Sequence, residues 1–175
     1  PDPQRLCDWL SASGVGRHTQ VVAYDDCGGT MAVRLWWLLR WLGHEAVAIL
    51  DGGWPRWITE SKPVDTALPA AGPATRFECA PDWQQVVTTA QLKTQIESGQ
   101  TELLLVDART AERFRGEAEP IDPVAGHIPG ARNLPLQQHL TPDGRFKSGS
   151  ELRALYDELL SGHPAPAVAA MCGSG

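Results

Sequence analysis

The residues with the clearest chemical potential are Cys172, Gly173, Ser174 and Gly175, which follow the apolar run 167–171. Glycines let successive backbone N–H groups turn toward one point and form a concavity that binds anions. A thiol in such a field readily ionises to a nucleophilic thiolate. Ser174 could donate a hydrogen bond to that sulfur or to a bound substrate. The alternative is a buried thiol at a strand end, so this stretch alone leaves both interpretations open.

Alternating helices and strands must position this loop. Short apolar runs predict buried strands, and apolar residues at helical spacing predict helices. Strands that alternate with helices are typical of an α/β fold with a parallel sheet. The expected helices lie around 6–10, 31–42, 89–98 and 150–160, and the expected strands at 21–24, 46–50, 103–106 and 167–171.

The two halves of the chain share one pattern of elements. A helical pattern, a turn and a strand precede Asp25 in the first half and Cys172 in the second. A stretch rich in Pro, Ala and Thr without sustained periodicity separates the halves and predicts a linker over 64–81. We therefore expect two copies of one α/β unit, in 1–63 and 82–175, with Asp25 at the position equivalent to Cys172.

The net charge and the hydropathy pattern bear on two classes of partner, nucleic acids and membranes. The 15 Lys and Arg residues against 21 Asp and Glu residues give a net charge of −6, which disfavours nucleic-acid binding. The longest apolar stretch, 35–42, contains Arg40 and is far shorter than the ~20 residues of a membrane span. We expect no nucleic acid and no membrane among the partners. The chain opens without Met, so its natural start is expected upstream, and no signal peptide is visible.

The four cysteines are too sparse for a disulfide scaffold and show no spacing typical of zinc ligands. An even number makes a disulfide possible, but nothing in the sequence supports one. We therefore expect reduced thiols in a cytoplasmic protein, with Cys7 and Cys79 incidental. Cys27 lies two residues after Asp25, which argues against a role in turnover.

The sequence resembles the two-domain rhodanese-like sulfurtransferases over essentially its whole length. Gly126-His127-Ile128-Pro129-Gly130-Ala131, at its distance before the cysteine loop, is the most specific match. The other matching stretches are Val21-Val22-Ala23-Tyr24-Asp25, Arg34-x-Trp36-Trp37-x-Leu39-x-x-x-Gly43-His44, Leu50-x-Gly52-Gly53-Trp54-x-x-Trp57, Leu105-Val106-Asp107-Ala108-Arg109, Arg113-Phe114 and Cys172-Gly173-Ser174-Gly175.

This resemblance implies two rhodanese-like domains, both incomplete in these 175 residues, each a parallel sheet flanked by helices. The first would be inactive, with Asp25 in place of a cysteine, and the second would act through Cys172. Family members take a sulfane sulfur from 3-mercaptopyruvate or thiosulfate onto the cysteine as a persulfide. They then pass it to cyanide or a thiol, with a thioredoxin-like protein as one candidate acceptor. No metal or organic cofactor is implied.

Arg113 matches the arginine with which the family binds the anionic group of the donor. A guanidinium suits this role because it offers paired donors to a planar anion. The alternative is a solvated loop arginine. The Cys-Gly-Ser-Gly start resembles the 3-mercaptopyruvate branch, yet Ile121 stands after Glu119-Pro120 where that branch carries a second arginine. Gly173, Ser174 and Gly175 complete the expected substrate site.

Structural roles are expected for His127, in a turn, and for Asp107, as an anchor of nearby loop groups. Two other functions remain open from the sequence. A cysteine phosphatase of the same architecture needs a longer loop that closes with Arg, and a non-catalytic rhodanese module would need neither Cys172 nor Arg113. Because the helix expected after the loop lies beyond Gly175, we expect these 175 residues alone to be poorly active.

Overall fold

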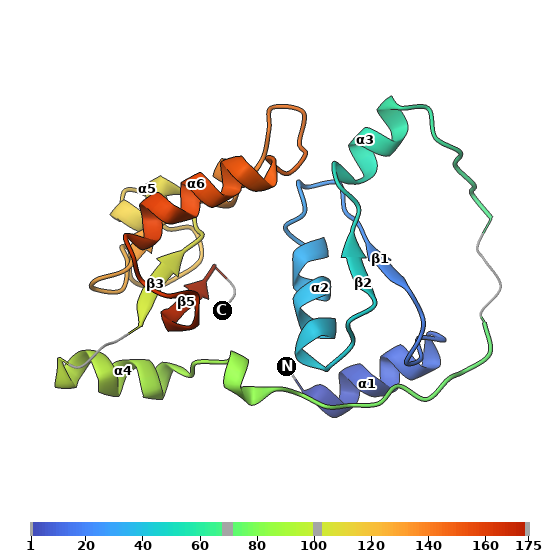
Figure 1. Ribbon diagram of the computed structural model, residues 1–175, viewed down its shortest axis with the longest axis horizontal. Coiled ribbons are helices and arrows are strands. Elements are labelled where there is room, and N and C mark those ends of the chain that lie inside the picture. The colour runs from blue at the N-terminus through green and yellow to red at the C-terminus, as the bar shows by residue number, and fades with distance from the viewer. Residues whose placement is uncertain (1, 68–71, 100–102, 174–175) are drawn as a thin grey trace. The chain divides into compact units, whose positions relative to one another are not determined.

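The computed structural model describes residues 2–67, 72–99 and 103–173. The chain divides into two compact units, Pro1–Val86 with Asp143–Arg145, and Val87–Pro142 with Phe146–Gly175. Each unit contains a parallel sheet with flanking helices (Figure 1). The expected α/β class is therefore confirmed.

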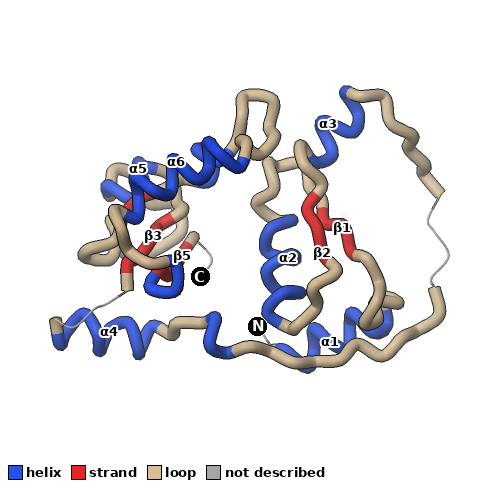
Figure 2. Tube along the Cα trace, viewed as in Figure 1, coloured by secondary structure: helices blue, strands red, loops and turns tan. Residues whose placement is uncertain are grey.

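Unit 1 is built around a pair of parallel strands (Figure 2). Strand β1 pairs with β2 so that Val21 lies opposite Val47, and α2 packs against both strands. The apolar α2 sequence buries Leu39 and Trp41 in the core, beside Leu10 of α1. The elements are α1 (Pro3–Ala12), β1 (Val21–Ala23), α2 (Ala32–Trp41), β2 (Val47–Ile49) and α3 (Gly53–Thr59).

The second half of the expected linker packs against unit 1. Phe77 is only 7% exposed, and its backbone N–H donates to Ser11 Oγ at 3.0 Å. The N–H of Asp82 donates to the carbonyl oxygen of Trp41 at 2.9 Å. This part of the chain therefore completes the core of unit 1, although its sequence has no helical or strand period.

A disulfide between Cys7 and Cys79 joins α1 to this packed segment. The expectation of reduced, incidental thiols at these two positions was therefore wrong. The pairing brings together residues 72 positions apart, and it depends on how an aperiodic segment folds back onto α1. Sequence spacing does not reveal such a pairing.

Unit 2 holds a three-stranded parallel sheet in the order β4-β3-β5. The central strand β3 is buried along its whole length, as the apolar run before Asp107 predicts. Capping boxes at Thr88 and Ser148 fix the starts of α4 and α6. The elements are α4 (Thr89–Ser98), β3 (Leu104–Asp107), α5 (Ala111–Arg115), β4 (Arg132–Asn133), α6 (Gly149–Leu160) and β5 (Val168–Met171), with 3-10 helices at Trp83–Gln85, Leu136–His139 and Ala165–Ala167.

The eight elements expected from periodicity are all present. Three short elements were not expected, namely α3 with 7 residues, α5 with 5 and β4 with 2. None is long enough to display a clear period in the sequence. Helix α5 carries Arg113.

Candidate functional site

Strand β5 delivers Cys172 to the carboxyl end of the parallel sheet. Met171 lies opposite Asp107 of β3, and Cys172 follows directly as an exposed residue. The N–H of Ala108 donates to the carbonyl oxygen of Met171 at 2.9 Å, so the two strand ends are fixed together. Ligands of open α/β sheets bind at this edge. Ser174 and Gly175, two of the expected substrate-binding residues, lie outside the described residues.

Arg113 lies directly against the loop that begins with Cys172. A β-carbon built on Gly173 would be 2.5 Å from Arg113 Nη1 and 3.5 Å from its Cζ. The guanidinium thus occupies the space that a side chain at position 173 would need. Because α5 follows β3 after only three residues, the fold brings Arg113 to the same sheet edge as Cys172. The structure therefore places three of the expected site residues side by side.

Two acidic residues hold the Arg113 guanidinium. Nε donates to Glu119 Oε2 at 3.2 Å, and Nη2 donates to Glu119 Oε1 at 2.7 Å and to Asp122 Oδ2 at 3.0 Å. The Glu119 side chain is 4% exposed, whereas that of Asp122 is 47% exposed. The bonds from Arg113, with those from the backbone N–H groups of Asp122 and Ile121, lower the pKa of Glu119 to about 2.

A second arginine anchors this cluster to the sheet. Asp107, fully buried at the end of β3, accepts hydrogen bonds from Arg109 N, Nε and Nη2 at 2.7–3.1 Å. These contacts raise the pKa of Arg109, and its guanidinium forms an ion pair with Asp107. Arg109 also donates from Nη2 to the carbonyl oxygen of Gly126 at 2.7 Å and from Nη1 to Glu119 at 3.3 Å. Asp107 is thus an anchor of loop groups, as expected.

The Gly126–Pro129 turn supports α5 from another side. The His127 ring stacks on Phe114 with ring centroids 3.7 Å apart, and its Nδ1 bonds the carbonyl oxygen of Phe114 at 2.7 Å. Gly116 must lack a side chain here, because its φ is +76° and an added β-carbon would lie 3.2 Å from the Gly126 nitrogen. His127 therefore packs against α5 from outside the helix, which is a structural role.

Sequence reasoning did not identify Glu119 or Arg109 as site residues. A partial signal exists, since Arg109 follows two residues after an acidic residue that ends a buried strand. No sequence pattern indicates the bond between Glu119 and Arg113, because it forms only when the loop after α5 folds back over six residues.

Unit 1 carries a filled anion cradle at the corresponding loop. Asp25 Oδ1 accepts from the N–H groups of Cys27 at 3.1 Å and Gly29 at 2.8 Å. Oδ2 accepts from the N–H groups of Met31 at 2.8 Å and Ala32 at 2.9 Å. Partial burial raises the pKa of Asp25, but these four backbone donors outweigh it and hold the pKa below its ordinary value. This loop therefore binds negative charge through its backbone.

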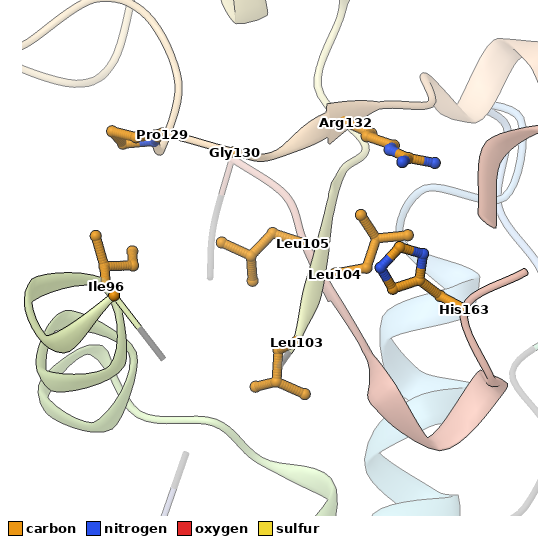
Figure 3. Close-up of a pocket in the computed structure, with 9 residues that line it drawn as sticks. Ile96, Leu103, Leu104, Leu105, Pro129, Gly130, Arg132 and His163 are labelled. Atoms are coloured by element: carbon orange, nitrogen blue, oxygen red, sulfur yellow. The ribbon is translucent and has the colours of Figure 1, made fainter. Parts of the chain in front are cut away.

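Three further features bear on ligands. Among the residues that the structure describes, no group of three or more His, Cys, Asp or Glu side chains could hold a metal ion. None of the described helices is long and apolar enough to cross a membrane. A cavity of about 350 Å³ lies in unit 2 beside β3, and both aliphatic residues such as Leu105 and the polar residues Arg132 and His163 line it (Figure 3). Neither Cys172 nor Arg113 lines this cavity, so it is separate from the cysteine site.

Comparisons with known proteins agree with the duplicated architecture. The family described as "Rhodanese-like domain" matches residues 3–60 and 88–175. The chain is 43% identical over 176 residues to the "Probable 3-mercaptopyruvate sulfurtransferase" of Pseudomonas aeruginosa, covering 100% of this chain and 61% of that protein. It is 37% identical over 179 residues to the "3-mercaptopyruvate sulfurtransferase" of Homo sapiens, covering 100% and 59%.

A solved structure shows the same similarity to this group of proteins. The crystal structure of SseA from Escherichia coli, described as showing the rhodanese fold and catalytic mechanism of 3-mercaptopyruvate sulfotransferases, superposes with a TM-score of 0.80 at 30% identity. The superposition covers 100% of this chain and 64% of that one. The chain thus spans about three fifths of the length of these curated relatives.

Proposed function

This chain belongs to the rhodanese-like family, and on that premise we propose that the full-length protein is a sulfurtransferase that acts through a persulfide on Cys172. The donor is 3-mercaptopyruvate in preference to thiosulfate, and the acceptor is cyanide or a thiol, including a thioredoxin-like dithiol. The observation that carries the proposal is the Arg113 guanidinium against Gly173, because it puts a fixed positive group beside an exposed cysteine at the sheet edge.

In the first half-reaction, the Cys172 thiolate attacks the sulfur of 3-mercaptopyruvate. The new S–S bond forms while the C–S bond of the donor breaks, and the electron pair of that bond goes to carbon. The proton of the donor thiol ends on this carbon, so the products are pyruvate and an ionised Cys172 persulfide. With thiosulfate, the same attack breaks the S–S bond of the donor and releases sulfite.

In the second half-reaction, the acceptor attacks the outer sulfur of the persulfide. Cyanide leaves as thiocyanate. A thiol leaves as a hydropersulfide, with the proton of the thiol on the outer sulfur. The S–S bond to Cys172 breaks, and its electron pair regenerates the thiolate. No external oxidant or reductant is consumed when the acceptor is cyanide or a single thiol.

Two groups of the chain stabilise the charges in this cycle. Arg113 binds the anionic group of the donor through Nη1, which faces the cysteine loop, because Glu119 and Asp122 already accept hydrogen bonds from Nε and Nη2. The loop that begins at Cys172 binds the persulfide through its backbone N–H groups, and we include Gly173, Ser174 and Gly175 among these. The Asp25 loop supports this assignment, because its four N–H groups already bind an anion in the duplicated unit.

The donor preference rests on Gly173 and on the relatives. A side chain at position 173 would displace Arg113, so Gly173 is the residue that lets a guanidinium lie over the loop. The relatives from Pseudomonas aeruginosa and Homo sapiens are named for 3-mercaptopyruvate. Ile121 is 68% exposed, and its aliphatic side chain offers the donor no charge. Donor binding is therefore expected to depend chiefly on Arg113.

The test compares full-length wild-type protein with Cys172→Ser, and uses Cys27→Ser as the matched thiol control. Pyruvate, sulfite and thiocyanate are measured with 3-mercaptopyruvate and with thiosulfate. We expect transfer to be lost in Cys172→Ser, retained in Cys27→Ser, and faster from 3-mercaptopyruvate. Transfer that survives in Cys172→Ser, or none by folded wild-type protein from either donor, would refute the proposal.

A further inference from the structure

We propose that Glu119 is a positioning residue of the donor site, which holds the Arg113 guanidinium over the cysteine loop. This inference rests on the proposed function, because it explains how the donor-binding group is fixed. Glu119 itself is not expected to touch the donor or the reacting sulfur.

The geometry of the Glu119–Arg113 pair defines which nitrogen is left for the donor. Glu119 accepts from Nε at 3.2 Å and from Nη2 at 2.7 Å, a two-point contact that fixes the plane of the guanidinium. The remaining nitrogen, Nη1, is the one that lies closest to Gly173. Glu119 thus occupies the Nε–Nη2 edge of the guanidinium, Asp122 accepts a further bond from Nη2, and Nη1 faces the cysteine loop.

Glu119 can act as a clamp because it is itself immobilised. Its side chain is 4% exposed and its Oε1 accepts from the N–H groups of Ile121 and Asp122 at 3.0 Å each. Its Oε2 also lies 3.3 Å from Arg109 Nη1, and Arg109 is bound to the fully buried Asp107. A continuous set of charged hydrogen bonds therefore runs from the end of β3 to Arg113. Such pre-ordering lowers the entropy lost when an anionic donor binds.

The neighbouring pair Arg115–Glu117 provides a matched comparison. Glu117 also binds its arginine at two points, at 2.7 and 2.8 Å, but both side chains are more than half exposed. Exposed pairs of this kind contribute little to stability. Glu117→Gln therefore removes the same charge from the same loop without releasing Arg113.

The first measurement is steady-state sulfur transfer by full-length Glu119→Gln and Glu117→Gln. For Glu119→Gln we expect kcat/KM with the anionic donor to fall about tenfold or more, mainly through a higher KM. Glu117→Gln should stay near wild type. The release of sulfur from preloaded persulfide to a neutral thiol should change little in either variant, because that step does not bind the anionic donor. An unchanged KM in Glu119→Gln would overturn the proposal.

The second measurement does not depend on sulfur transfer. Iodoacetate is anionic and iodoacetamide is neutral, but both alkylate the same thiol. The rate with iodoacetate divided by the rate with iodoacetamide at Cys172, measured on its peptide by mass spectrometry, therefore reports the nearby guanidinium. If Glu119 positions Arg113, the ratio falls in Glu119→Gln. If Glu119 only offsets charge, its removal raises the ratio, and the proposal is wrong. Asp122→Asn is the charge control, since its exposed carboxylate also binds Nη2, and its ratio should rise.

The two measurements separate the possible failures. An iodoacetamide rate at Cys172 close to wild type shows that the loop of the variant is intact. A wild-type protein that shows the charge preference but transfers no sulfur would refute the proposed function alone. A sulfurtransferase whose ratio and KM are unaffected by Glu119→Gln would refute only the positioning role.

Discussion

Replacing Gly173 with alanine tests the packing of Arg113 against the cysteine loop. The new β-carbon would lie 2.5 Å from Arg113 Nη1, whereas unbonded heavy atoms settle at about 3.5 Å. The guanidinium must therefore move by about 1 Å. Gly173 is not among the glycines with positive φ, so alanine adds this clash without strain in the backbone. A displacement of ~1 Å in a positioned group can reduce the rate ~100-fold, and we expect kcat/KM for the anionic donor to fall by about that factor.

The assay is initial-rate sulfur transfer by full-length Gly173→Ala, with Gly149→Ala as the matched control. Gly149, at the first turn of α6, has open space around its Cα, so its alanine variant should retain activity. The iodoacetamide rate at Cys172 verifies that the thiol of Gly173→Ala remains accessible. A kcat/KM within about threefold of wild type would show that the Arg113 guanidinium does not have to lie over Gly173, and would refute the reasoning.

Two further predictions concern stability. Removing the Cys7–Cys79 disulfide, by Cys7→Ser with Cys79→Ser or by reduction, should lower the free energy of unfolding by ~2–4 kcal/mol; equal melting temperatures with and without dithiothreitol would contradict it. Below neutral pH, Glu119 should make the fold acid-sensitive, because its folded pKa is about 2 and its unfolded pKa is about 4.3. A carboxyl with a lowered pKa stabilises the fold above its unfolded pKa, and this contribution is lost as pH falls from about 4.3 toward 2. Urea unfolding from pH 6 to pH 2 should show a weaker pH dependence in Glu119→Gln than in Glu117→Gln; identical profiles would contradict the assignment.

Most of the framework could be predicted from the sequence because long elements display their period. The apolar α2 sequence and the buried β3 run each identify one element without reference to the rest of the chain. The equivalence of Asp25 and Cys172 followed from comparing the halves, and both residues do follow a parallel strand. These features depend on local sequence, which is why they could be read directly.

The missed features depend on contacts between segments that have no period. Cys79 meets Cys7 only because an irregular segment packs its Phe77 into the core. Glu119 meets Arg113 only because the loop after α5 turns back toward its own helix. In both cases the residue types are ordinary, and the tertiary path of the chain determines the partner.

The filled cradle at Asp25 has a consequence for competition between the two units. Its carboxylate is covalently tethered beside the four backbone N–H groups that it binds. A donor anion from solution would have to replace all four hydrogen bonds of this intramolecular ligand. The duplicated loop of unit 1 therefore withdraws no donor from solution, and substrate titrations should show no inhibition from anion binding at Asp25.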